Sequence, residues 1–152
     1  MNFEKYMNEA LILAREAAAE GEIPVGCVIA DKAGNIIGRG RNRREKTRLA
    51  SSHAEMDALN EACKALGDWR LDGCTAFVTL EPCPMCAGAM INARLGTLVY
   101  GAKEPQFGSA CSIINLFEER YPGHTAIYGG ILKEESEALL QTFFAAVRSE
   151  KK

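Results

Sequence analysis

The chain has 152 residues, a length that suits one domain whose core is large enough to need no disulfides. Its hydrophobic fraction is 47% and its charged fraction 25%, ordinary globular values that exclude a disordered chain, a collagen and a coiled coil. The net charge is −2, from 18 basic and 20 acidic residues, and this whole-chain balance argues against a generic nucleic-acid binder. We therefore expect residues 1–152 to form a single domain.

No stretch of the chain approaches the ~20 apolar residues that a membrane-spanning helix needs. Residues 1–20 mix Glu and Lys with apolar residues, which is not typical of a signal peptide. We therefore expect a cytoplasmic protein without a membrane partner. In that compartment the six cysteines should be thiols or metal ligands rather than a disulfide framework.

Helical and strand-like patterns alternate along the whole chain. In chain order they predict a helix over 3–20, a hairpin of strands 25–30 and 36–40, a polar loop over 42–52, a helix over 53–66, a strand over 75–80, an apolar helix over 83–93, a strand over 98–101, a loop over 102–112, a short helix over 113–119, a strand over 125–128 and an amphipathic helix over 133–147. This alternation predicts an α/β fold in which helices cover both faces of one sheet.

The predicted helix over 83–93 is apolar nearly all round. Such a helix is buried either in the core or at a subunit contact, which leads us to expect a homodimer. The last predicted helix has one apolar face, formed by Leu139, Leu140, Phe143, Phe144 and Val147.

Two short motifs carry the chemical information in the sequence. His53 opens one predicted helix, and Cys83 and Cys86 lie on the first turn of another, so both sulfurs can reach one ion. The positive end of the helix dipole also favours thiolates there. Three protein ligands with a fourth position left to water are typical of a catalytic zinc site.

Glu55 lies two residues after His53 and need not be a ligand. Zinc lowers the pKa of a bound water to about 7, and a carboxylate within reach can pass its proton to the substrate. Hydroxide attack on a ring carbon that carries an amino group would release ammonia. His-x-Glu combined with Pro-Cys-x-x-Cys is the known signature of zinc-dependent nucleobase deaminases.

Other interpretations of these motifs remain open. Cys-x-x-Cys alone also occurs in thiol redox sites, although those have no upstream His-x-Glu. A closed structural zinc site would need a fourth ligand, for which the candidates are Cys63, Cys74, Cys111 and His124.

The chain resembles the cytidine deaminase superfamily and, within it, the bacterial tRNA-specific adenosine deaminases. The resemblance rests on residues 23–26, 40–43, 53–55, 78–90, 99–102 and 130–132. It implies a three-layer α/β/α fold with a five-stranded mixed sheet, a homodimer with sites near its interface, and conversion of wobble adenosine to inosine in tRNA anticodon loops. It also implies that His53, Cys83 and Cys86 ligate Zn²⁺ and that Glu55 shuttles protons.

The resemblance further implies that Asn42 binds the substrate base and that an aromatic pair, Phe143 and Phe144, lies near the substrate. A local turn is the alternative role for Asn42, and core packing is the alternative for the aromatic pair. The chain departs from the family pattern at residues 49–52 and 103–108, which leaves the chemistry intact but bears on the choice of substrate.

A basic segment precedes His53. Residues 39–48 contain six basic residues and one acidic residue, so this segment carries +5 and the rest of the chain −7. Its arginines, Arg43 and Arg44 among them, are candidates to bind RNA phosphates, and a solvated polar loop is the alternative.

The sequence is therefore compatible with three functions. The first is a zinc-dependent tRNA adenosine deaminase. The second is a zinc-dependent deaminase of a free nucleobase or nucleoside, such as guanine, cytosine or a modified purine. The third is a non-enzymatic RNA-binding subunit, which the intact Glu55 disfavours because binding alone needs no proton shuttle.

Overall fold

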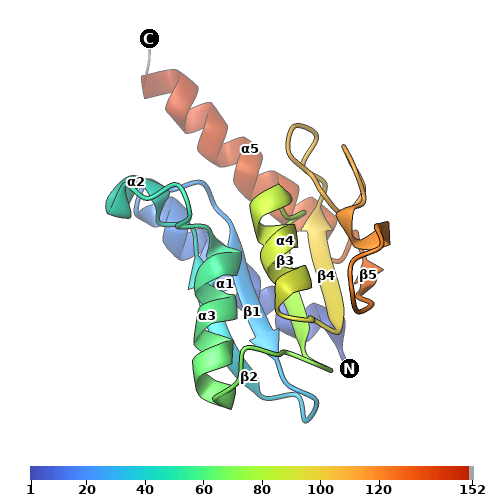
Figure 1. Ribbon diagram of the computed structural model, residues 1–152. Helices are drawn as coiled ribbons and strands as arrows, with labels where there is room; N and C mark the ends of the chain where they lie inside the picture. The colour runs from blue at the N-terminus through green and yellow to red at the C-terminus, as the bar shows by residue number, and fades with distance from the viewer. Residues whose placement is uncertain (151–152) are drawn as a thin grey trace.

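The centre of the fold is a five-stranded mixed sheet with the strand order β2-β1-β3-β4-β5 (Figure 1). The computed structural model describes residues 1–150. Its strands are β1 Gly26–Ala30, β2 Ile36–Arg41, β3 Thr75–Leu80, β4 Thr97–Ala102 and β5 Ala126–Tyr128. β1 pairs antiparallel with β2 and β3, whereas β3, β4 and β5 are parallel. The predicted five-stranded mixed sheet is confirmed.

Helices cover both faces of this sheet, which confirms the three-layer α/β/α prediction. Figure 1 shows α3 Ala54–Leu66 and α4 Pro84–Asn92 on the front face of the sheet and α1 Phe3–Ala19 and α5 Lys133–Glu150 behind it. Apolar residues alternate between two cores along β1: Cys27 and Ile29 face the α3 side, and Val28 and Ala30 face α1.

Helix α3 lies directly on strand β2 because two glycines leave room for it. A methyl group added at Gly38 would overlap the carbonyl oxygen of Ala58, and one added at Gly40 would overlap that of Ala54. Ala54 is the first residue of α3. This close approach therefore fixes where α3 begins relative to the hairpin.

The connection from β3 to β4 places α4 on the same face as α3. Strand β3 is buried along nearly its whole length, as a central strand with both faces covered should be. The chain leaves its carboxyl end through Glu81 and Pro82 and enters α4 with Pro84 at the first helical position, where proline is favoured. The starts of α3 and α4 consequently meet at one end of the sheet.

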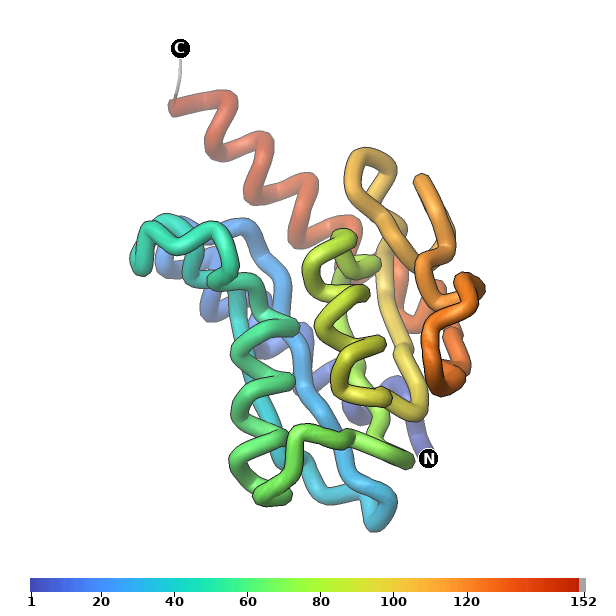
Figure 2. The backbone as a smooth tube through the Cα atoms, viewed as in Figure 1, coloured from blue at the N-terminus to red at the C-terminus, as the bar shows by residue number. Residues whose placement is uncertain are grey.

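Two sequence predictions need correction. The predicted loop over 42–52 contains a single helical turn, α2 Arg44–Thr47, and the predicted helix over 113–119 is only the 3₁₀ turn η1 Leu116–Glu118. The apolar face of α5 is only partly covered: Phe144 is exposed, the other four apolar residues of that face are half-buried, and Ser136 is the only fully buried residue of the helix. Figure 2 shows why: the helix leaves the sheet and extends beyond the body of the fold.

Helix α4 is buried on one side only. Cys86, Ala87 and Met90 are fully buried, whereas the Met85 side chain is 37% exposed. The core of this chain therefore covers one side of the helix, and the predicted subunit contact on its other side stays a prediction. Within residues 1–150, no helix combines the length and the apolarity that crossing a bilayer requires.

Candidate metal and catalytic site

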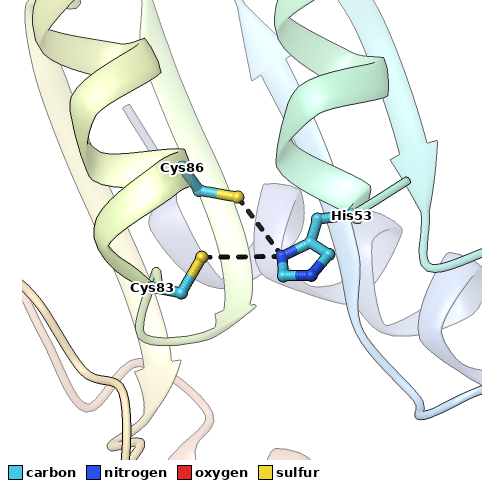
Figure 3. A group of neighbouring side chains, drawn as sticks. All are labelled: His53, Cys83 and Cys86. Atoms are coloured by element: carbon cyan, nitrogen blue, oxygen red, sulfur yellow. Dashed lines mark hydrogen bonds between the residues drawn. The ribbon is translucent and has the colours of Figure 1, made fainter. Parts of the chain in front are cut away.

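Three side chains converge where α3 and α4 begin, and they are the three predicted metal ligands. Nδ1 of His53 lies 3.6 Å from Sγ of Cys83 and 3.5 Å from Sγ of Cys86. Figure 3 shows both sulfurs pointing at the same ring nitrogen. A tetrahedral ion with bonds of about 2.0 Å to nitrogen and about 2.3 Å to sulfur separates those atoms by about 3.5 Å. The spacing of the three side chains therefore fits one tetrahedral zinc ion.

The chain places these ligands by a simple local rule. His53 is the N-cap residue of α3 and Cys83 is the N-cap residue of α4, both with extended backbone. Cys86 follows within the first turn of α4 and is fully buried. Both helices direct the positive ends of their dipoles at the site, which stabilises thiolate there.

The electrostatics of the three residues suit a cation ligand set. The hydrogen bond from the Cys86 thiol and the contact with His53 lower the pKa of Cys83 to about 4, against the opposing effect of burial. The same bond to Cys83, together with burial, raises the pKa of the Cys86 thiol. The hydrogen bond with Cys83 raises the pKa of His53. The two cysteines therefore share one proton, and a divalent cation that both sulfurs bind would displace this proton.

Glu55 is the second residue of α3 and lies beside this group, with its side chain only 4% exposed. Burial raises the pKa of Glu55 to about 7, and the negative charge of Cys83 adds to this effect. A carboxyl group that titrates near neutral pH can both accept and donate a proton, which is the property of a general acid–base group.

The remaining cysteines and the second histidine lie elsewhere. The potential metal group contains His53, Cys83 and Cys86. Among residues 1–150, no further histidine, cysteine or carboxylate joins it as a fourth ligand. The group therefore has the open composition of a catalytic site rather than the closed composition of a structural one. Cys27 and Cys74 are buried in the core, whereas Cys111 is exposed.

The predicted substrate-binding residues are not all at the site. Asn42 is buried, and its side chain donates to the carbonyl of Ile23, 19 residues earlier, and accepts from the N–H of Arg44 in the adjoining turn. Arg43 pairs with Asp57 on α3, with its Nη2 2.9 Å from the carboxylate.

The other two predicted substrate-binding residues are exposed. Arg44 faces solvent, and Phe144 lies on the outer part of α5 with 41% of its side chain exposed. The ring of Phe144 packs edge-on against Phe143. Phe143 is half-buried and Phe144 is exposed, and neither is among the buried core residues of this chain.

Glu81 lies next to the site and was not among the predicted site residues. Glu81 is 2% exposed, and its carboxylate accepts hydrogen bonds from the backbone N–H groups of Glu104, Ala110, Cys111 and Ser112. It also accepts the hydroxyl of Ser112. Because Glu81 lies two residues before the first cysteine of the site, it ties the loop over 103–112 to the start of α4. An acidic residue at the end of a buried strand is the only signal in the sequence for this role.

Comparisons with known proteins agree with this fold. The fold and the His/Cys group define a deaminase of the cytidine deaminase type. The model of the MafB19-like deaminase family matches residues 1–148, and the chain belongs to that family. The tRNA-specific adenosine deaminase of Bacillus subtilis (strain 168) is 45% identical over 150 residues, which cover 98% of this chain and 92% of that protein.

Solved structures give the same result. A structure from a study of A-to-I editing by tRNA A34 deaminases superposes with a TM-score of 0.85 and 37% identity, covering 90% of this chain and 99% of that one. A guanine deaminase from Nitrosomonas europaea superposes with a TM-score of 0.82 and 27% identity over 93% of this chain and 84% of that one. The resemblance to the cytidine deaminase superfamily is confirmed.

Proposed function

We propose that this protein is a zinc-dependent hydrolase that converts the wobble adenosine of tRNA anticodon loops to inosine, releasing ammonia. The observation that carries the proposal is the site itself: the His53, Cys83 and Cys86 ligand atoms lie within 4.8 Å of one another, with the buried Glu55 alongside. The 45% identity to a tRNA-specific adenosine deaminase over nearly the whole chain supports this choice of substrate.

His53, Cys83 and Cys86 would hold the zinc ion through Nδ1 and the two sulfurs. When bound, zinc lowers the pKa of water to about 7 and so supplies a nucleophile at neutral pH. Both cysteines belong to the start of α4, which is fixed by Pro84 at the first helical position and by the burial of Cys86. Their positions are therefore set before the ion binds.

Glu55 would move the protons. Its carboxylate accepts one proton from the attacking water and delivers it to the purine ring nitrogen, then takes the second proton from the same oxygen, now bonded to the ring carbon, and delivers it to the leaving amine, so that adenosine and water yield inosine and ammonia. Burial favours the neutral form of Glu55, which is why its pKa near 7 allows both directions of transfer at cellular pH.

Substrate contacts would come from the segment before His53 and from the last helix. Arg44 is exposed beside the site and can reach a phosphate, and Arg43 can do so in competition with Asp57. Asn42 would contact the base by exchanging its hydrogen bonds with Ile23 and Arg44. Phe144 offers an exposed ring for stacking on a splayed base.

We also propose a homodimer that works in the cytoplasm, where tRNA is modified. Several large apolar side chains near the site are exposed in the single chain. They are Met85 on α4 and Phe107, Ile113 and Ile114 after β4. A second copy that covers the outer face of α4 would bury them. Sedimentation at micromolar concentration should show a dimer, and a monomer would contradict this arrangement.

The alternative is deamination of a free base such as guanine, which the superposition with a guanine deaminase favours. The two functions separate in one assay. Zinc-loaded protein is incubated with an anticodon stem-loop that carries wobble adenosine and, separately, with guanine, and ammonia is followed. We expect ammonia from the stem-loop. Turnover of guanine with none of the stem-loop would reverse the assignment.

A further inference from the structure

The turn formed by residues 43–48, here called the basic turn, carries four basic residues and one acidic residue, Glu45, and three of its cations have no ion-pair partner in the described part of the chain. Arg43 is paired with Asp57. Arg44, Lys46 and Arg48 are all exposed, and none has an acidic partner within ion-pair distance among residues 1–150. Three free cations therefore project from a turn that ends just before His53.

A buried carboxylate holds this turn from beneath. Glu22 is 2% exposed, yet it lies in a segment between α1 and β1 that is distant in sequence from the turn. One of its oxygens accepts the backbone N–H of Glu45 at 3.0 Å, and the other accepts that of Lys46 at 2.9 Å. The N–H of Glu22 donates in turn to Ala17 at the end of α1. The basic turn is thereby connected to the core helix.

Further bonds leave the turn little freedom. The hydroxyl of Thr47 donates to that of Ser52 at 2.6 Å, and the N–H of Arg43 donates to the Ser52 carbonyl. Arg48 has φ 59°, a left-handed conformation that is rare for a side chain of this size. A loop that served only to connect β2 with α3 would need neither a buried carboxylate nor a strained arginine, because water can satisfy its backbone.

We propose that Glu22 is a positioning residue for RNA binding, which holds Arg44, Lys46 and Arg48 as a rigid surface for the phosphates of the strand that flanks the target base. The inference rests on the proposed function, since it takes RNA as the substrate. Its physical reason is preorganisation: cations already fixed in one arrangement lose less conformational entropy when they bind phosphates. Lys46 and Arg48 are thereby added to the residues that contact the substrate.

The test uses zinc-loaded protein and an anticodon stem-loop with wobble adenosine, and it measures kcat, KM and the salt dependence of KM. In Glu22→Gln an amide N–H₂ would face a backbone N–H, so the turn loosens. We expect KM to rise about tenfold with kcat and zinc content unchanged. Glu9→Gln, which makes the same charge change on α1, should leave KM unaltered.

A second variant tests the contribution of the exposed cations while leaving Glu22 unchanged. Lys46→Gln/Arg48→Gln removes two exposed charges and should raise KM about tenfold while lowering the slope of log KM against log salt by about 1.4. Arg15→Gln on the exposed side of α1 should change neither quantity. If Glu22→Gln fails to fold, this variant alone decides.

The outcomes distinguish failure of the proposed function from failure of the positioning role of Glu22. A wild-type protein that does not deaminate the stem-loop overturns the proposed function and this inference with it. A wild-type protein that does so, combined with unchanged KM and salt slope in Lys46→Gln/Arg48→Gln, overturns the inference alone. A loss of kcat in a folded Glu22→Gln variant would show general damage to the site and would also overturn the positioning role.

Discussion

His53 and Cys83 occupy equivalent positions in two different helices. Each is an N-cap residue, of α3 and of α4 respectively, and Nδ1 of the first lies 3.6 Å from Sγ of the second. The site therefore depends on how the two helix starts are aligned rather than on any one loop. Whatever shifts α3 along β2 or α4 along β3 should change the metal site before it changes the fold.

Removal of one sulfur should remove the metal. Cys83→Ser replaces a thiolate whose pKa is lowered to about 4 with a hydroxyl that remains protonated. We expect about one zinc per chain in the wild type and a large loss in the variant, measured by elemental analysis after dialysis. Cys111→Ser, which changes an exposed cysteine outside the group, should keep its zinc. Full zinc in Cys83→Ser would exclude Cys83 as a ligand.

Loss of Glu55 should separate chemistry from metal binding. Glu55→Ala removes the proton carrier but none of the three ligands, so zinc content should stay the same while kcat falls by ~10² or more. Glu61→Gln on the exposed side of the same helix is the control and should be fully active. Near-normal turnover in Glu55→Ala would contradict the assigned role.

A methyl group on β2 should disturb the site from a distance. Gly40→Ala places Cβ against the carbonyl oxygen of Ala54, the residue after His53, so α3 has to move. We expect a loss of about 1–3 kcal/mol in the free energy of unfolding and weaker zinc binding. Gly88→Ala on α4 meets nothing within 4 Å and should not destabilise the chain. Denaturant unfolding and a zinc competition assay measure both effects.

The Glu81 carboxylate gives the fold a dependence on pH. Burial alone would raise the pKa of Glu81, but the hydrogen bonds from Ser112, Glu104 and Ala110 lower it below its ordinary value of 4.5. A lowered pKa means that its contribution to stability is present above about pH 4.5 and disappears as the pH falls through the folded-state pKa.

Glu81→Gln tests this directly. The variant leaves buried N–H groups without an acceptor and should lose about 1–3 kcal/mol at pH 7. Urea unfolding of both proteins should show the difference between them shrinking below about pH 4.5. A difference that stays constant with pH would mean that the carboxylate charge is not what holds the loop over 103–112.

The two arginines proposed to contact RNA should differ in effect. Arg44→Gln removes a free charge and should raise KM for the stem-loop. It should also lower the slope of log KM against log salt by about 0.7. Arg43→Gln also frees the carboxylate of Asp57, so part of its effect would come from that new negative charge. The double variant Arg43→Gln/Asp57→Asn isolates the arginine. Equal KM values for Arg44→Gln and wild type would favour a small substrate.

The sequence was most informative where local pattern and burial agree. The strand over 75–80 was predicted exactly as β3 because its apolar run has no competing interpretation. The spacing of His53, Cys83 and Cys86 predicted one metal group because both motifs fall at helix starts, and the geometry has all three side chains together.

Features that depend on distant residues could not be predicted. Helix α2 is held by Glu22, about twenty positions earlier, and nothing in the polar segment itself indicates a helical turn. The role of Glu81 likewise depends on a loop that begins more than twenty residues later. The apolar face of α5 is only partly covered, yet its sequence is the same as that of a core-facing helix, since periodicity shows that a face is apolar but not what covers it.

The most direct test of the account is the position of inosine in a product RNA. Zinc-loaded wild type is incubated with an anticodon stem-loop that has adenosine at the wobble position and at other loop and stem positions, and the product is sequenced, with Glu55→Ala as the control. The account predicts inosine at the wobble position alone, and none with Glu55→Ala. An unmodified stem-loop under conditions in which the same protein deaminates guanine would contradict it.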